Sequence, residues 1–318
     1  MKRPDIEPSL HDEAARAGWL YYVGGMTQDQ IAGELGVSRQ RAQRLVSRAM
    51  AEGLIQVRLN PQIGLCLDLE TRLTDRFGLT RCRVAPTLAA GDDPVRSIAP
   101  SAAVELERYL RMTEPQVIAF GTGRTLRAMA EQFNPTEAQH HRIVSLIGNI
   151  APDGSATLYD VIRRVAEKLM APYFPMPVPV ISDTAEERAF YHHLRPVQAV
   201  VALVAQADVT FVGVGQMTDD APLVVDGFVS PAEMADFQRK GAAGEIASWV
   251  YDDHGHYITS DRDQLVGAVR VEPGSDKPVI GVCAGPNKVR AIRAALQGRI
   301  INGLVTDEAT AAAILAAH

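Results

Sequence analysis

Near the amino end of the chain, arginine and glutamine side chains recur at helical spacing, and both types can read nucleic acid. They donate paired hydrogen bonds to guanine and adenine edges in the major groove, and arginine also binds backbone phosphates. Residues three and four apart share one face of a helix. The side chains expected on the outer face are Arg39, Gln40, Gln43, Arg44 and Ser47, and Arg48 is also expected to contact DNA. This pattern predicts a helix that docks on duplex DNA.

The residues before and within this helix supply the elements that would hold the face outward. Thr27 and Gln30 have the spacing of a capping box, and Gly36 suits a turn that needs positive φ. Ser38 then starts the second helix as its N-cap. The apolar positions expected on the inner side are Ile31, Ala32, Leu35, Val37, Ala42, Leu45, Val46 and Ala49. The spacing predicts a helix-turn-helix in which Thr27, Gln28 and Ser38 also contact DNA.

A further helix is expected upstream, over residues 11–23. The side chains predicted to cover the back of the motif are Ala15, Trp19 and Tyr22. Downstream, Gly53 would end the second helix, and the alternating residues 54–59 are typical of a short strand or wing. The alternative is a plain pair of short helices whose arginines are merely solvated. Four arginines precede Glu52, the only acidic residue of that helix, and they favour DNA binding.

Length and charge bound the organisation of the chain. With 318 residues and 47% hydrophobic content, we expect two domains, a DNA-binding domain at 1–60 and an effector domain at 61–318. The net charge of −6 disfavours a protein that coats nucleic acid indiscriminately. Residues 1–60 carry eight Lys and Arg against seven Asp and Glu, which is +1 and leaves −7 for the remainder. Any DNA contact is therefore local.

Cysteines and hydrophobic runs exclude several classes of protein. Cys66, Cys82 and Cys283 lie far apart and form no CxxC pair, so neither a disulfide framework nor a zinc site is indicated. No apolar run reaches about 18 residues, and the amino terminus lacks the hydrophobic region of a signal peptide. We therefore expect a cytoplasmic protein that has no metal and no contact with a membrane.

From residue 81 onward, short β-branched runs alternate with helical periodicity, which is typical of an α/β domain with a largely parallel sheet. The strands expected are residues 83–85, 117–120, 143–146, 178–181, 209–214, 269–271, 279–282 and 304–306. An amphipathic helix is expected at 65–77, and the proline-rich residues 171–180 are expected to form an extended loop. The histidine pairs at 140–141 and 192–193 have no partner motif, so they are expected at the surface.

Three apolar runs end in glycine and lead into helical sequence, at residues 117–126, 209–217 and 279–292. Such turns lie at the carboxyl ends of parallel strands, where ligands bind, so neighbouring strands would bring them to one crevice. In the first turn, Gly121 and Gly123 would let the backbone approach an anion. The chain lacks a Walker A lysine, and a leucine replaces the third glycine of a dinucleotide fingerprint. We therefore expect no nucleotide cofactor.

These positions also have plainer explanations. Glycine is the default residue of a tight turn, and Lys288, which could reach an anionic or hydroxylated ligand, could equally be a surface lysine. Asp252 opens the sequence DDHGH, whose carboxylates could accept hydrogen bonds from sugar hydroxyls or hold a metal, but turns collect Asp and Gly for conformational reasons. No complete catalytic motif is present, so an enzyme is not expected.

Taken in order, the motifs resemble those of one family, the SorC/DeoR family of sugar-responsive bacterial transcription regulators. Among the segments that carry the resemblance are WLYYVGGMTQDQIAGELGVSRQRAQRLV at 19–46, FGTGRTL at 120–126, ADVTFVGVGQM at 207–217, GEIASWVYDDHG at 244–255 and GPNKVRAI at 285–292. The resemblance implies a winged-helix-like helix-turn-helix domain joined to a larger Rossmann-like effector domain. That effector domain is similar in fold to ribose-phosphate isomerase and glucosamine-phosphate deaminase.

The resemblance also implies the effector contacts. They are Gly121, Thr122, Gly123, Thr125, Gly213, Gly215, Gln216, Asp252 and Lys288. Arg124 departs from the small or acidic residue that many members have after the second glycine, and it would either strengthen phosphate binding or block the site. Family members assemble as dimers and tetramers, so a homo-oligomer is expected, as suits a motif that must span two half-sites.

The leading hypothesis is a ligand-controlled transcription factor that represses a carbohydrate or polyol operon. A sugar, polyol or sugar phosphate would control its operator affinity, and the helix at 65–77 is the candidate relay. One alternative is a phosphosugar-processing enzyme that uses Asp252 or His254 as acid or base and Lys288 as an anchor. Another is a DNA-binding activator whose effector pocket is vestigial.

Overall fold

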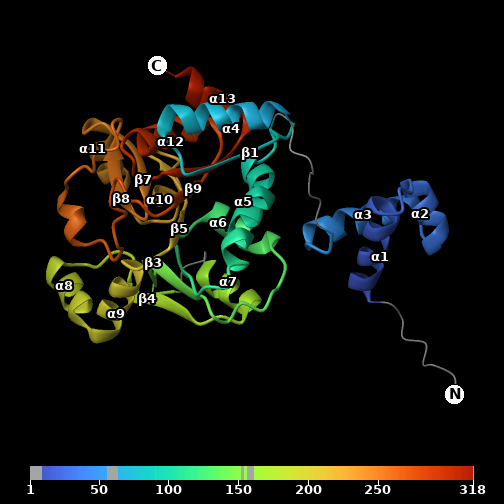
Figure 1. Cartoon of the computed structure of the whole chain (residues 1–318), viewed down its shortest axis with the longest axis horizontal. Coiled ribbons are helices and arrows are strands. Elements are labelled where there is room, and N and C mark those ends of the chain that lie inside the picture. The colour runs from blue at the N-terminus through green and yellow to red at the C-terminus, as the bar shows by residue number, and fades with distance from the viewer. Residues whose placement is uncertain (1–8, 56–63, 90, 152–153, 156–160, 318) are drawn as a thin grey trace. The chain divides into compact units, whose positions relative to one another are not determined.

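A computed structural model of the chain describes residues 9–55, 64–89, 91–151, 154–155 and 161–317 (Figure 1). The chain divides into two compact units, Met1–Pro61 and Gln62–His318. In the described ranges, no helix combines the length and the apolar character that crossing a membrane requires.

The described part of the amino-terminal unit is helical. Its helices are α1 (Leu10–Tyr22), α2 (Gln28–Leu35) and α3 (Arg39–Ala51). Gly36 ends α2 with a φ of 64°, and Ser38 caps α3, as predicted. The buried core consists of Ala14, Ala17, Ile31, Ala32, Ala42, Leu45 and Val46. These elements confirm the helix-turn-helix, whereas residues 56–59 of the predicted wing lie outside the described residues.

Helices α1 and α3 cross closely because the residues at the crossing are small. A Cβ at Gly18 would stand 2.7 Å from the Ala49 Cβ and 2.7 Å from the Ile55 Cγ1. The prediction that Trp19 and Tyr22 cover the back of the motif is wrong, since their side chains are 60% and 41% exposed. A large side chain does not fit where two helix backbones approach this closely.

The larger unit is built on a sheet in which seven described strands pair in parallel. In spatial order, these strands are β1 (Arg81–Ala85), β10 (Gly303–Asp307), β9 (Val279–Val282), β5 (Val209–Val212), β2 (Val117–Phe120), β3 (Arg142–Ile150) and β4 (Tyr173–Pro179). Successive strands β2, β3 and β4 extend one way, while β5, β9 and β10 extend the other. The chain therefore reverses its direction of travel across the sheet between β2 and β5.

Helices cover both faces of this sheet, as a parallel sheet requires. The helices packed on one face are α5 (Pro94–Leu110), α6 (Arg124–Gln132) and α7 (Val161–Leu169). Those packed on the other are α4 (Gly64–Phe77), α9 (Arg195–Val204), α12 (Val289–Gln297) and α13 (Glu308–Ala316). Under the first set, the Phe120 and Phe211 rings stack with their centroids 5.5 Å apart. The predicted α/β class and the helix predicted at 65–77 are confirmed.

An antiparallel sheet, which the sequence pattern did not predict, is inserted between β5 and β9. Its strands are β6 (Gly215–Gln216), β7 (Ala242–Ile246) and β8 (Trp249–Asp252). The remaining helical elements are α8 (Ala185–His193), α10 (Pro222–Val225), α11 (Pro231–Arg239), η1 (Asp261–Gln264) and η2 (Pro286–Lys288). Between β7 and β8, Ala247 and Ser248 have φ values of 51° and 69°, a conformation that residues with side chains rarely adopt.

Two strand predictions are wrong. Residues 173–179 form β4 instead of a loop, and the strand predicted at 178–181 therefore lies too late in the chain. β4 accommodates its prolines because it is an edge strand, where a missing N–H donor is tolerated. Residues 269–271 form no strand, although the Val269 N–H donates to the Leu146 carbonyl at 2.8 Å.

The surface position predicted for His141 is also wrong, since its side chain is fully buried. The Gln116 N–H donates to its Nδ1 at 3.0 Å, and its Nε2 lies 3.2 Å from the Leu110 carbonyl oxygen. The ring thus joins two backbone segments as a neutral imidazole whose Nε2–H is the donor. Burial lowers the pKa of His141.

Candidate DNA-recognition surface and effector site

Three side chains on the outer face of α3 are exposed and uncommitted. Gln40, Gln43 and Arg44 are exposed, and within the described part of the chain their side chains form no hydrogen bond or ion pair. The buried side of the helix consists of Ala42, Leu45, Val46 and Ala49, as predicted. Free donors and acceptors on one exposed helical face are able to reach base edges in a major groove.

Two other arginines of α3 that were predicted to contact DNA form ion pairs with nearby carboxylates. The Arg39 Nε lies 3.3 Å from the Asp29 Oδ1, and the Arg48 Nε lies 2.6 Å from the Glu52 Oε1. Exposed ion pairs of this kind contribute about 0–1 kcal/mol. Either arginine can therefore exchange its carboxylate for a DNA phosphate with little loss.

Arg41 has a different role, which sequence reasoning missed. Its Nη2 lies 2.7 Å from the Glu13 Oε2, so the pair ties α3 to α1. Spacing within α3 does not distinguish Arg41 from the other arginines of that helix. Only the packing of α1 identifies it.

Thr27 and Ser38 stand at the starts of α2 and α3. The Thr27 Oγ1 accepts from the Gln30 N–H at 3.3 Å, and the Ser38 Oγ accepts from the Arg41 N–H at 3.2 Å. Both hydroxyls therefore act as caps, while other N–H groups at the two helix starts can donate to phosphates. The DNA contacts of Thr27, Gln28 and Ser38 stay predictions.

In the larger unit, the three glycine turns follow the neighbouring strands β9, β5 and β2, which meets the condition for a shared crevice. Ligands of α/β proteins bind at the carboxyl ends of strands where chain order reverses, here between β2 and β5. The two turns there touch. The Gly121 N–H donates to the Phe211 carbonyl at 2.8 Å, and a Cβ at Gly213 would stand 3.3 Å from the Thr122 carbonyl oxygen.

The turn after β2 presents backbone donors. Gly123 has a φ of 121° and precedes α6 without a side-chain cap, so no cap from that residue occupies the first N–H groups of the helix. Thr125 in that first turn is only 6% exposed, whereas Arg124 is exposed. Uncapped N–H groups at a helix start favour an anion. The phosphate contacts of this turn stay a prediction.

Lys288 joins the turn after β9 to the turn after β5. Its half-buried side chain donates from Nζ to the Val214 carbonyl at 2.8 Å. Gly285, with a φ of 120°, sets the turn that leads to it. Lys288 is therefore a fixed cation beside the glycine turns and not a free surface lysine.

Glu245 on β7 is a residue that sequence reasoning missed. Its Oε2 accepts from the Ser248 N–H at 2.9 Å, and its Cδ would stand 2.9 Å from a Cβ at Gly215. Gly215 is therefore needed to admit this carboxylate. Burial raises the pKa of Glu245, while the Ser248 N–H and the charges of Lys288 and Arg262 oppose that rise. The sequence feature that could have identified Glu245 is an acidic residue among the apolar residues of a strand.

Arg262 on η1 was also missed. The residue is 7% exposed, its Nη1 lies 3.7 Å from the Glu233 Oε1, and its Nε and Nη2 have no hydrogen-bond partner. Burial lowers the pKa of Arg262, which the charges of Glu233 and Glu245 oppose. Arg262 and Lys288 are therefore the two cations whose charges act on Glu245, which lies against Gly215 in the turn after β5.

The Asp252 side chain accepts hydrogen bonds within the turn that it begins. Its Oδ1 accepts from the His254 N–H and the His256 N–H, each at 2.9 Å, and the next residue, Asp253, pairs with Arg290 at 2.6 Å. These bonds account for the DDHGH sequence as a turn between β8 and the bridge that follows it. An effector contact from Asp252 stays a prediction.

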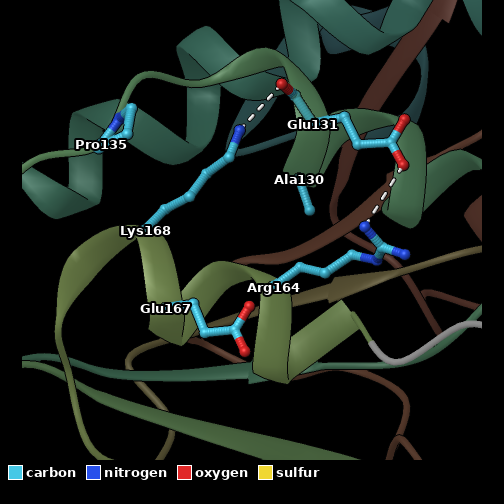
Figure 2. A pocket seen from close by; sticks show the side chains of 6 residues that line it. All are labelled: Ala130, Glu131, Pro135, Arg164, Glu167 and Lys168. Atoms are coloured by element: carbon cyan, nitrogen blue, oxygen red, sulfur yellow. Dashed lines mark hydrogen bonds and ion pairs between the residues drawn. The ribbon is translucent and has the colours of Figure 1, made fainter. Parts of the chain in front are cut away.

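A hollow of about 280 Å³ lies elsewhere, between α6 and α7 (Figure 2). The Lys168 Nζ donates to the Glu131 carbonyl at 2.9 Å and to the Phe133 carbonyl at 2.8 Å, and Arg164 pairs with Glu131 at 3.8 Å. The hollow adjoins the carboxyl end of α6, whereas the glycine turn precedes its amino end. Because no residue of the glycine turns lines this hollow, we do not assign the effector to it.

Comparison with known proteins finds relatives for both units. Residues 62–316 match the family described as "Putative sugar-binding domain", and residues 17–62 match the MarR family. The chain is 34% identical over 311 residues to the erythritol catabolism regulatory protein EryD of Brucella abortus (strain 2308), covering 98% of each chain. It is 32% identical over 308 residues to the transcriptional regulator LsrR of Escherichia coli (strain K12), covering 96% of this chain and 94% of that protein.

Comparison with solved structures also finds a regulator that is similar over nearly the whole chain. The crystal structure of the full-length sorbitol operon regulator SorC from Klebsiella pneumoniae matches with a TM-score of 0.72 and 26% identity, covering 95% of this chain and 97% of that one.

Proposed function

We propose a function from one premise: the chain belongs to the SorC/DeoR family of sugar-responsive bacterial transcriptional regulators, as its sequence resemblance indicated. It is a DNA-binding regulator with a sugar-binding domain, and not an enzyme. Within that family, we propose that it represses a carbohydrate or polyol catabolic operon. A sugar, polyol or sugar phosphate bound in the larger unit then changes its operator affinity.

The observation that carries the DNA-binding half of the proposal is the uncommitted outer face of α3. Gln40, Gln43 and Arg44 would read bases, because their side chains are exposed and have no partner in the described part of the chain. Arg39 and Arg48 would bind phosphates in place of their present carboxylates.

The glycine turns and their charged neighbours support the effector half. Backbone N–H groups at the start of α6 suit a phosphate, while Lys288 and Glu245 supply one cation and one acceptor beside the β5 turn. Hydroxyl groups of the effector can accept a hydrogen bond from Lys288 and donate one to Glu245. The relatives that name erythritol and sorbitol make a polyol or its phosphate the first ligand to test.

Regulation requires the effector to bind two arrangements of the protein with different affinities. We assign the relay to α4, the first described helix of the larger unit. Its Cys66, Leu69 and Leu73 are packed in the core of that unit, so a change at the sheet moves the helix. Leu65 and Leu67 are exposed on the same helix.

We propose a homo-oligomer, dimer or tetramer, because two half-sites one helical turn apart need two copies of α3. The exposed side chains of Trp19, Tyr21 and Tyr22 on α1 supply apolar surface for such an assembly. Analytical ultracentrifugation of the full chain should give a mass at least twice 34.4 kDa. A monomer at micromolar concentration would contradict this part of the proposal.

The test of the whole proposal is a gel shift at stated salt with the DNA upstream of the protein's own gene. We expect a specific complex that at least one member of a panel weakens, the panel being erythritol, sorbitol, D-ribose 5-phosphate and their phosphorylated or dephosphorylated forms. Absence of any specific complex would contradict the DNA-binding assignment. A complex that every ligand leaves unchanged would favour the vestigial pocket, and tightening of the complex would favour an activator.

A further inference from the structure

In the described residues, eight buried side-chain nitrogen or oxygen atoms have no hydrogen-bond partner. Two of them, Nε and Nη2, belong to Arg262 on η1. An unsatisfied buried polar atom is costly, so native structures rarely leave one without a reason. Because Arg262 is the only described residue with two such atoms, it is the strongest candidate to receive a partner from outside the chain.

The geometry of Arg262 determines which hydrogen-bonding groups a partner must present. Nε and Nη2 point from the same edge of the guanidinium, and this edge donates two parallel hydrogen bonds. The opposite corner, Nη1, is the one that faces Glu233, at 3.7 Å. Arg262 is 7% exposed, so the free edge is held in a protein environment and not in water. It requires two neighbouring acceptor oxygens.

Packing links Arg262 to the strand that carries Glu245. Glu233, which faces Arg262, lies on α11, and α11 packs on β7. The Glu245 carboxylate lies against Gly215 in the turn after β5, and the charges of both Arg262 and Lys288 act on it. Lys288 itself donates to the Val214 carbonyl of the same turn. Two cations and one carboxylate therefore belong to the surroundings of this turn.

The presence of both cations and a carboxylate, Arg262, Lys288 and Glu245, indicates the chemical class of the partner. A hydroxyl group accepts from a guanidinium and at the same time donates to a carboxylate, so a pair of hydroxyls satisfies both residues. A phosphate has no proton to give a carboxylate when fully ionised, and it would meet the negative charge of Glu245 at close range. The start of α6, which follows a glycine turn, is the better position for a phosphate.

Resting on the proposed function, we infer that Arg262 is the specificity-determining residue of the effector site. Its Nε and Nη2 donate to two adjacent hydroxyl oxygens of the effector, a vicinal diol, and Glu245 accepts from one of them. The two nitrogens have no accessible surface, so the ligand reaches them only when the covering segments move. That movement gives the effector its preference for one arrangement of the protein.

The experiment measures ligand affinity of the full chain by isothermal titration calorimetry, with ligands paired so that one member lacks a vicinal diol. The pairs include D-ribose 5-phosphate with 2-deoxy-D-ribose 5-phosphate, and erythritol with 1,4-butanediol. For the pair that wild type binds, we expect the intact diol to bind roughly 10- to 100-fold tighter, as the loss of a charged hydrogen bond implies.

Two variants locate the discrimination. Arg262→Lys keeps the charge but loses the fork, and Arg262→Gln loses both, so each should bring the affinity ratio of the pair close to one. Arg239→Gln is the matched control, since this exposed arginine on α11 pairs with Asp236 and should keep the wild-type ratio. A structural role alone would lower both affinities together and leave their ratio unchanged.

The outcomes separate the two proposals. If wild type binds no member of the panel, the proposed effector site fails and the role of Arg262 fails with it. If wild type binds but does not discriminate within a pair, or if the Arg262 variants keep the wild-type ratio, only the role of Arg262 is wrong. The wild-type measurement decides this even where a variant does not fold.

Discussion

The two units hold their functional side chains in opposite ways. On α3, the exposed Gln40, Gln43 and Arg44 have no partner in the described part of the chain, whereas Lys288 and Glu245 in the larger unit are bonded to backbone groups of their own crevice. A duplex presents its groups over a wide surface, so free and exposed side chains suit it. A small ligand is recognised by a few groups that must be held in place and shielded from water.

This comparison predicts which of the two binding activities a variant in each unit should change. Variants on α3 should change DNA binding and leave ligand binding alone, while variants in the crevice should change the response to ligand and leave DNA binding alone. The units belong to one chain but have separate cores, one around Ile31 and Leu45 and the others around the seven-stranded sheet. Each prediction below tests that separation.

The largest effect is expected from Gly18→Val. Its Cβ would collide with Ala49 and Ile55, so the amino-terminal unit should lose roughly 1–3 kcal/mol of stability or more, enough to unfold so small a core. Operator binding should then be lost while calorimetric ligand binding persists. Gly33→Ala is the control, because nothing lies within 4 Å of its position on α2, and DNA binding should survive it. Loss of ligand binding in Gly18→Val would show that the units do not act separately.

Arg44→Ala should come next. Removing a base-reading arginine should weaken specific operator binding by roughly 1–3 kcal/mol without changing the affinity for ligand. Arg72→Ala removes an equally exposed arginine, paired with Asp68 on α4, and should leave operator affinity near that of wild type. Fluorescence anisotropy with specific and scrambled duplexes measures both. Equal weakening on the two duplexes would mean that Arg44 contacts only phosphate.

Lys288→Ala should have a smaller effect, confined to the response. The variant loses the cation that is fixed on the Val214 carbonyl, so we expect ligand affinity to fall by roughly tenfold while ligand-free operator binding stays normal. Lys277→Ala is the matched control, because this exposed lysine pairs with Asp208 before β9 begins. If Lys288→Ala abolished DNA binding while remaining folded, the separation of roles would be wrong.

The smallest effect concerns pH and only the larger unit. Burial lowers the pKa of His141 below its ordinary value of 6.5, so the stability that the neutral ring contributes is present above that pH and is lost as the pH falls. The unfolding midpoint of the larger unit should therefore decrease between pH 7 and pH 5. In His141→Gln this part of the decrease should be absent, which differential scanning calorimetry can resolve. An identical pH profile in the variant would contradict the assignment.

The sequence predicted what depends on nearby residues. The helix-turn-helix follows from caps and apolar spacing within residues 27–49, and each of these signals involves positions no more than a few residues apart. Most strands of the central sheet were also found, because a parallel strand buried on both faces is a continuous apolar run. The adjacency of the three strands that lead into glycine turns was only a condition in the sequence reasoning, because strand order depends on the whole sheet.

What the sequence did not predict depends on distant packing. The proline-rich residues 173–179 form a strand only because β4 lies at an edge, which is a property of the whole sheet. Glu245 and Arg262 have no local motif, because Gly215 admits the first and Glu233 faces the second, and only the folded chain brings these residues together. Trp19 was expected to cover the back of the motif, yet it is exposed and the crossing of α1 and α3 is made by small residues.

The central claim is that occupancy of the crevice in the larger unit governs docking of α3 on DNA. The most direct test is operator affinity by fluorescence anisotropy at fixed salt, measured for wild type, Arg44→Ala and Lys288→Ala with and without the tightest ligand of the panel. We predict that ligand changes the wild-type affinity, that Arg44→Ala binds more weakly but responds by the same factor, and that Lys288→Ala binds normally but responds little. A ligand that saturates the wild-type crevice and leaves operator affinity unchanged would contradict the account.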